Sequence, residues 1–190
     1  MASLDSIMKP RSIAVVGAST KPNTIGSDLL KRLIEYGFTG KIYPVNPKGG
    51  VIEGLTAYPS VLDIPGDVDL AIIVVKNTFV LSTIDQCHEK GITGLVVISA
   101  GFKETDEAGA ALEKELAAKV KAYGMRCVGP NCLGVVNTDP AVRMDGCFAE
   151  SLPQRGDIGF VSQSGALGGG ILNILKDLNI GFSQFISIGN

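Results

Sequence analysis

Short apolar runs alternate with amphipathic stretches through the first 130 residues, and this alternation constrains the fold most. Unbroken apolar runs of strand length occupy residues 12–17, 69–75 and 94–99. Such runs are typical of strands buried on both faces of a parallel sheet. Helical patterns lie between them, at 25–37 and about 78–90, and each ends at a glycine. The order predicts parallel strands joined by crossover helices.

Two more strands and one more helix complete this first domain. They are predicted at 41–46, 126–129 and 105–123 respectively. Pro44 in the second strand favours an edge position or a strand end. Residues 50–66 contain two prolines and three glycines and are predicted to be mostly loop, with one helical turn at 60–63. The whole predicts a Rossmann-type doubly wound α/β domain over residues 1–136.

The remaining residues follow a different pattern. Residues 137–155 lack clean periodicity and are predicted to be an ordered linker. A strand at 156–161, a helix at 165–177 and a strand at 182–188 then form one βαβ unit. This unit, residues 156–190, is too small to bury its own core and is expected to be the truncated start of a second α/β domain that packs on the first or on another copy.

Composition excludes several classes of partner. The net charge of −2 and pI near 5.4 give no sign of a nucleic-acid or anionic-membrane surface. No apolar run reaches the roughly 18 residues of a spanning helix. The four cysteines form no CxxC pair and His88 is the only histidine, so no metal site is expected. The chain is expected to be cytoplasmic, with reduced thiols.

The loop at residues 17–26 is the first candidate site. Gly17 permits a sharp turn at the end of the first strand, and Ser19, Thr20 and Asn23 supply short polar groups. The N-terminus of the following helix favours an anion. These features predict phosphate binding. The alternative interpretation is a plain βα turn that is rich in small residues.

The glycine spacing argues against NAD. Gly26 is the next glycine after Gly17, so the loop departs from the GxGxxG fingerprint. The second strand ends in Asn46-Pro47-Lys48, with no carboxylate for a ribose. Lys48 favours a phosphorylated ribose, as in NADP or coenzyme A (CoA), although an exposed loop lysine explains it equally well.

Three later loops are expected to converge on the same edge of the sheet, because the carboxyl ends of parallel strands form the ligand crevice. They cover residues 75–78, 99–104 and 129–134. Ala100 and Gly101 leave room for a ligand, and Asn131 can bind an amide or a carbonyl. Lys103 and Glu104 are interpreted as a cap for the next helix.

The motifs VVGAST, VNPK, VVISAGFKE, GPNCLG and SQSGALGG occur in this order along the whole chain. Together they resemble the N-terminal part of the NDP-forming (ADP-forming) acyl-CoA synthetases, which are related to the succinyl-CoA synthetase α subunit. The resemblance implies a CoA-binding Rossmann domain followed by a flavodoxin-like ligase domain. An ATP-grasp region is then expected on the same chain or on another one.

The resemblance also implies specific contacts. CoA phosphates are assigned to Gly17, Ala18, Ser19, Thr20, Asn23, Ile25 and Gly26, and the adenosine end to Asn46, Pro47 and Lys48. The pantetheine arm is assigned to Val75, Lys76, Asn77, Ala100, Gly101 and Phe102, with Asn131 nearby. The helix start at Ser162, Gln163, Ser164 and Gly165 is implied to stabilise phosphate on a phosphohistidine. Relatives often carry a small pair such as Pro-Ala where this chain has Lys76-Asn77.

The implied reaction joins a small carboxylate to CoA through an acyl phosphate and a phosphohistidine, using ATP/ADP with Mg²⁺ in the parent enzyme. His88 is predicted to lie at the end of a helix and does not fit the catalytic role. The phosphohistidine is therefore expected downstream, and no catalytic residue is expected in this chain. Cys132 is interpreted as a small buried residue, against a thiol that pairs with CoA.

The implied partners are CoA, a small carboxylate or acyl-CoA, the remaining ligase and ATP-grasp parts, and a homodimer mate. Two other interpretations stay open. One is a stand-alone CoA-binding or regulatory Rossmann module, which would not need SQSGALGG. The other is an NADP-binding oxidoreductase domain, which lacks a recognisable catalytic group here.

Overall fold

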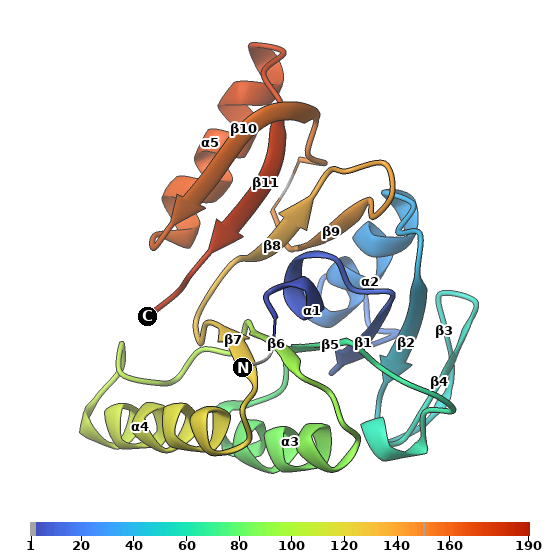
Figure 1. The fold of residues 1–190 in the computed structure, drawn as a ribbon, viewed down its shortest axis with the longest axis vertical. Helices are drawn as coiled ribbons and strands as arrows, with labels where there is room; N and C mark the ends of the chain where they lie inside the picture. Colours follow the sequence, from blue (N-terminus) through green and yellow to red (C-terminus); the bar gives the residue numbers. More distant parts are fainter. Residues whose placement is uncertain (1–2, 150) are drawn as a thin grey trace.

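The computed structural model describes residues 3–149 and 151–190, and its centre is a five-stranded parallel sheet (Figure 1). The strand order is β2-β1-β5-β6-β7. The strands are β1 (Ser12–Val16), β2 (Lys41–Val45), β5 (Leu70–Ile73), β6 (Gly94–Val97) and β7 (Arg126–Val128). The order confirms the predicted doubly wound topology, and β2, which contains Pro44, lies at an edge as expected.

Helices cover both faces of this sheet. Successive β1 side chains alternate between two cores, since Ile13 packs in the cluster with helix α2 and Ala14 in the cluster with α3. One face carries α1 (Asp5–Met8) and α2 (Ile25–Glu35), and the other carries α3 (Asn77–Glu89) and α4 (Glu107–Ala122) (Figure 1). Burial on both faces explains why the strands are apolar throughout.

A second, four-stranded sheet has the order β10-β11-β8-β9. Its elements are β8 (Gly134–Asn137), β9 (Met144–Cys147), β10 (Arg155–Ser162) and β11 (Phe182–Ser187), with helix α5 (Gly165–Asp177) between β10 and β11. The parallel pairing of β10 and β11 confirms the predicted βαβ unit. The unit does not stand alone, because β11 pairs antiparallel with β8 and extends the β8–β9 hairpin.

Two segments predicted to lack strands contain hairpins. The expected linker at 137–155 holds β9, and the expected loop at 50–66 holds β3 (Gly50–Ile52) and β4 (Leu55–Ala57) before a 3₁₀ turn, η1 (Val61–Asp63). These strands have only three or four residues, too few for alternation to be visible. In β9 the sequence MDGC is polar as well, yet all four residues are buried.

The buried polar groups of the hairpin are paired with the first domain. Asp145 of β9 is fully buried, and its Oδ2 lies 2.7 Å from Arg32 Nη2 of α2. Asn137 at the end of β8 donates from Nδ2 to the Met8 carbonyl at 2.7 Å. These contacts fix the second sheet against the α1–α2 side of the first. None of the described helices is long and apolar enough to cross a membrane.

Candidate functional site

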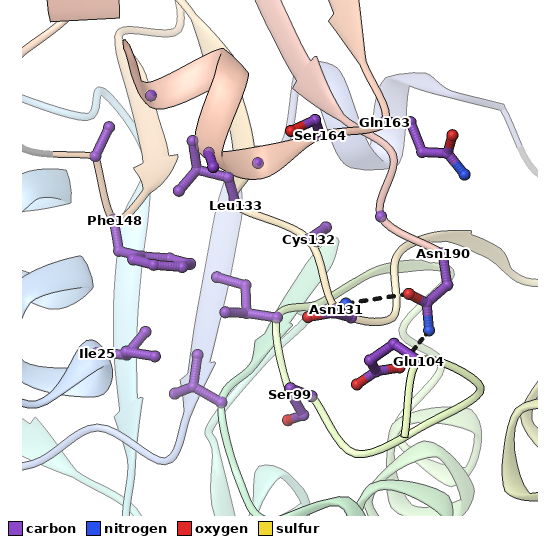
Figure 2. A pocket seen from close by; sticks show the side chains of 18 of the residues that line it. Ile25, Ser99, Glu104, Asn131, Cys132, Leu133, Phe148, Gln163, Ser164 and Asn190 are labelled. Carbon is purple, nitrogen blue, oxygen red and sulfur yellow. Dashed lines mark hydrogen bonds between the residues drawn. The ribbon is translucent and has the colours of Figure 1, made fainter. Parts of the chain in front are cut away.

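A cleft of about 1320 Å³ lies between the carboxyl edge of the first sheet and helix α5 (Figure 2). Four groups of residues line it. The first sheet and α2 supply Ile25, Val74, Val75, Lys76, Ile98, Ser99, Ala100, Lys103, Glu104, Asn131, Cys132 and Leu133; the segment after β9 supplies Phe148 and Ala149; α5 and its start supply Gln163, Ser164, Gly165, Ala166, Gly169, Gly170 and Asn173; and the end of β11 leads to Gly189 and Asn190. The cleft therefore joins both sheets.

The structure brings only some of the predicted residues to this cleft. Those in its lining are Ile25, Val75, Lys76, Ala100, Asn131, Gln163, Ser164 and Gly165. The predicted residues outside the lining are Gly17, Ala18, Ser19, Thr20, Asn23, Gly26, Asn46, Pro47, Lys48, Asn77, Gly101, Phe102 and Ser162. The first nine of these belong to the two loops that follow β1 and β2 and to the first turn of α2.

The loop after β1 is shaped by its two glycines. Gly17 has φ +101°, a conformation that favours glycine. A Cβ on Gly26 would lie 2.1 Å from the Gly17 carbonyl oxygen, so α2 begins in direct backbone contact with the end of β1. Thr24 caps α2 by accepting the Ser27 N–H at 3.4 Å. Gly26 thus provides the close helix–strand packing of a dinucleotide fingerprint at a different spacing.

Asn46 ties the first two loops together. Its Nδ2 donates to the Ala18 carbonyl at 2.8 Å, and its Oδ1 accepts from the Lys48 N–H at 2.9 Å. The side chain predicted to contact adenosine is therefore used to position both loops. Pro47 and Lys48 are exposed beside them, so the Lys48 ammonium is free to meet an anion in solvent.

The loops after β5 and β6 are also joined to each other. Asn77 Nδ2 donates to the Gly101 carbonyl at 2.6 Å, and Ser99 Oγ donates to the Val75 carbonyl at 2.5 Å. Phe102 was expected to contact the pantetheine arm, but its side chain is fully buried in the core beneath α3 and α4. Phe102 therefore anchors the loop, and Ala100 lies on the exposed side of it.

Glu104 was expected from the sequence to cap the next helix, but in the structure its side chain binds within the loop after β6. Asp106 is the cap of α4 and accepts the Gly109 N–H at 2.7 Å. The Glu104 carboxylate instead accepts the N–H groups of Gly101 and Phe102 and the Asn190 amide, the last at 2.6 Å. Burial opposes ionisation, but the Asn190 amide and the two backbone N–H groups outweigh it and lower the pKa of Glu104.

Asn190 connects this loop with the one after β7. Its Oδ1 accepts from Asn131 Nδ2 at 3.1 Å, and its backbone N–H donates to the Pro130 carbonyl at 3.0 Å (Figure 2). Asn131 itself has φ +54° and donates its N–H to the Ser99 carbonyl. The loops after β6, β7 and β11 therefore form one hydrogen-bonded rim.

The start of α5 points into the cleft from the opposite side (Figure 2). Ser164 Oγ accepts the Leu167 N–H at 3.2 Å, and Ser162 Oγ donates to the Ser164 carbonyl at 3.0 Å. Gly168 lets the helix lie on Phe185 of β11, because a Cβ there would approach the ring to 2.7 Å. First-turn N–H groups of a helix lack intrahelical acceptors, so this end suits an anion.

Two side chains with reactive groups, Cys132 and His88, lie in different places. Cys132 lies in the lining but is 4% exposed, and burial raises the pKa of its thiol to about 12. It is a buried thiol, as interpreted. His88 lies in the last turn of α3, where its ring stacks on Tyr123 of α4 at 4.0 Å. His88 is thus the exposed helix-terminal histidine that the sequence indicated.

Sequence reasoning missed the third wall of the cleft. Phe148 and Ala149 follow β9 in the segment that was predicted to be linker. Leu133 beside them belongs to the loop after β7, which was expected at this edge. Phe148 is 36% exposed and points into the cavity above Ile25 (Figure 2). The only available signal was an aromatic residue in an otherwise polar stretch, which by itself has no specificity.

The fold and the cleft define a doubly wound α/β nucleotide-binding domain whose ligand edge is completed by a second βαβ unit. A family model described as a CoA binding domain matches residues 11–138. A second, described as a succinyl-CoA ligase like flavodoxin domain, matches residues 155–190. The chain belongs to the CoA-binding domain family, and its resemblance to the ADP-forming acyl-CoA synthetases is confirmed.

Characterised relatives agree with this assignment. The chain is 49% identical over 187 residues to subunit alpha of acetate–CoA ligase (ADP-forming) II from Pyrococcus furiosus, covering 98% of this chain and 40% of the relative. It is 43% identical to 4-hydroxybutyrate–CoA ligase (ADP-forming) from Nitrosopumilus maritimus, covering 97% of this chain and 26% of that protein. The chain thus spans less than half the length of these relatives.

Solved structures show the same fold. A dinucleotide-forming acetyl-coenzyme A synthetase 1 from Ca. Korarchaeum cryptofilum, in complex with phosphate and ADP, superposes with a TM-score of 0.94 at 43% identity, covering all of this chain and 40% of that one. A hypothetical protein from Pyrococcus horikoshii OT3 is 31% identical with a TM-score of 0.52, covering 63% of this chain and 76% of that one. The second match corresponds in size to the first domain alone.

Proposed function

We propose that this chain binds coenzyme A and is the CoA-binding portion of an ADP-forming acid–thiol ligase. The observation that carries the proposal is the CoA-binding family match over residues 11–138. The hydrogen-bonded loops at the carboxyl edge of its sheet are the second support. Domain boundaries at residues 136 and 155 belong to the same proposal, with the second unit being part of a flavodoxin-like ligase domain.

Each end of CoA has a chemically suited place in this arrangement. The loop between Gly17 and Gly26 would hold the diphosphate, because the start of α2 provides N–H donors and a favourable dipole. Lys48 would meet the 3′-phosphate of the ribose. The pantetheine arm would then cross the loops at residues 75–77 and 100–102 into the cleft. Asn131 would bind one of its amides.

The start of α5 would serve the phosphate chemistry of the parent enzyme. A phosphohistidine carried outside this chain would approach Ser164 and Gly165, where the helix dipole stabilises the phosphoryl charge. ATP/ADP and Mg²⁺ would be bound by an ATP-grasp part that this chain does not supply. Within the described residues no cluster of acidic, cysteine and histidine side chains suits a metal ion. The chain by itself should therefore bind CoA without forming acyl-CoA.

Titration calorimetry with CoA, dephospho-CoA, NADP⁺ and NAD⁺ tests the proposal. CoA should bind tightest, and removal of its 3′-phosphate should weaken binding by roughly tenfold, the value of one charge-assisted contact. The variant Lys48→Ala should lose that discrimination, and the neighbouring exposed Lys41→Ala should keep it. Tighter binding of NADP⁺ than of CoA, or acyl-CoA formation by this chain alone, would overturn the proposal.

The second unit exposes an apolar surface that is suited to binding another protein. Large apolar side chains are exposed on α5, directly after it and on the edge strand β10, namely Leu167, Ile174, Leu178, Ile158 and Val161. Surfaces of this kind mark interaction sites. We assign this surface to the remaining ligase parts of the parent enzyme, and a second copy of this chain is the competing partner. We also expect the parent enzyme to use a small carboxylate or acyl-CoA as co-substrate and to act in the cytoplasm.

A stand-alone CoA-binding or regulatory module is the second candidate function. The smaller Pyrococcus horikoshii structure, which corresponds to the first domain alone, favours it. The α5 helix start, which closes the cleft here, argues against it. The length of the parent open reading frame separates the two.

A further inference from the structure

One end of the cleft is lined by apolar side chains, which suit an apolar part of a ligand. Phe148 and Ile25 are 36% and 43% exposed, although both lie in a concave site (Figure 2). Leu133 lies above them and is nearly buried. Exposed aromatic and aliphatic side chains that face each other inside a cleft mark the apolar part of a ligand.

Phe148 is held firmly in this position. Its backbone N–H donates to the Leu133 carbonyl at 3.3 Å. Leu133 in turn supports α5, because Cβ atoms built on Gly165 and Gly169 would lie 3.5 and 3.8 Å from its side chain. Three residues before Phe148, Asp145 is paired with Arg32, which lies on the same helix as Ile25. A buried ion pair therefore connects the helix that carries Ile25 with the segment that carries Phe148.

The position of this gap along the ligand path identifies the group it would take. Ile25 is the first residue of α2 and lies at the end of the loop proposed for the diphosphate. In CoA the group joined to the diphosphate is the pantoyl unit, which carries two geminal methyl groups and is the most branched apolar part of the arm. The amides and the thiol lie further on, toward the polar rim at Asn131 and the start of α5.

We propose that Phe148 and Ile25 form a clamp for the pantoyl geminal dimethyl group, and that the segment after β9 thereby contributes a ligand-binding residue. This inference rests on the proposed CoA function and deepens it. It makes the pantetheine arm, and not only the nucleotide, a source of affinity and specificity. The clamp is assembled from the two domains that the Arg32–Asp145 pair holds together.

The test compares CoA with adenosine 3′,5′-bisphosphate, which keeps the nucleotide end and lacks the arm. Covering the exposed third of a phenylalanine side chain corresponds to roughly ten- to thirtyfold in affinity. Phe148→Ala should weaken CoA binding by about that factor and leave binding of the bisphosphate unchanged. The double variant Ile25→Ala/Phe148→Ala should weaken CoA binding roughly a hundredfold or more. Phe148→Leu should retain most of the affinity. Phe79→Ala, at an exposed phenylalanine of α3 outside the lining, is the matched control.

The outcomes are distinct. Selective loss of CoA affinity supports the clamp. Equal loss for both ligands, or no loss for CoA, overturns it and leaves the proposed function standing. If the unaltered chain binds neither ligand, the proposed function itself fails and the clamp fails with it. Circular dichroism of each variant shows that the fold is retained.

Discussion

Replacing Arg32 with methionine tests how the hairpin is held against the first domain. The guanidinium lies 2.7 Å from the Asp145 carboxylate, and the two side chains are 10% and 0% exposed. Methionine fills a similar space and leaves the carboxylate buried without its cation. Removing one partner of a buried pair costs about 3–5 kcal/mol.

The structure also limits this cost. A buried carboxylate that loses its cation can take up a proton, and burial already raises the pKa of Asp145 against the opposing effect of Arg32. Protonating a carboxyl with an ordinary pKa of 3.8 at pH 7 costs roughly 4.4 kcal/mol, at 1.36 kcal/mol per pH unit. At pH 5 the same step costs only about 1.6 kcal/mol. Arg32→Met should therefore destabilise the chain by about 3–4 kcal/mol at pH 7 and by less than half of that at pH 5.

Urea unfolding followed by circular dichroism at both pH values measures this difference. For a chain of this size, the loss at pH 7 corresponds to a fall in Tm of roughly 6–16 °C. The double variant Arg32→Met/Asp145→Asn should be more stable than Arg32→Met alone, because no buried ion remains. Lys31→Met is the neighbouring control, since its pair with Glu53 is 3.8 Å long and exposed and should contribute less than about 0.5 kcal/mol. A loss below 1 kcal/mol for Arg32→Met, or one that does not change with pH, refutes the reasoning.

Three further predictions follow from single contacts. Gly26→Ala should lower stability by about 2 kcal/mol or more and weaken CoA binding, because its Cβ would lie 2.1 Å from a carbonyl oxygen; Gly170→Ala, with nothing within 4 Å, should be neutral or slightly stabilising in the same thermal melts. Glu104→Gln should cost roughly 1 kcal/mol at pH 7. Since the pKa of Glu104 is lowered, its stabilisation is present above about pH 4.5 and is lost as the pH falls, so the wild-type and variant unfolding curves should converge in acid; a constant gap would contradict this. Cys132 should resist iodoacetamide at pH 8 until the chain is unfolded in urea, because its pKa is about 12; rapid labelling of the native Cys132 peptide by mass spectrometry would show otherwise.

Local sequence was enough to predict the first sheet and the βαβ unit. A strand such as β1 is buried on both faces, so its apolar run is continuous, and the glycines at 17, 37 and 91 mark where turns or helix ends occur. The crossover rule then converts that order into parallel pairing. The phosphate loop and the α5 start were visible for the same reason, since backbone turns and small residues are local properties.

The third wall of the cleft depended on contacts between segments far apart in the chain. Asp145 and Asn137 are buried because Arg32 and the Met8 carbonyl satisfy them from more than 100 residues away, and a polar sequence gives no sign of such partners. The use of Asn46 within the loops, the core position of Phe102 and the role of Glu104 at the rim were likewise hidden. The sequence by itself determined a nucleotide-binding βα unit and a second βαβ unit. Only the tertiary structure decided that a polar hairpin joins them and brings Phe148 to Ile25, because burial of charge is set by a partner in space and not by neighbours in the chain.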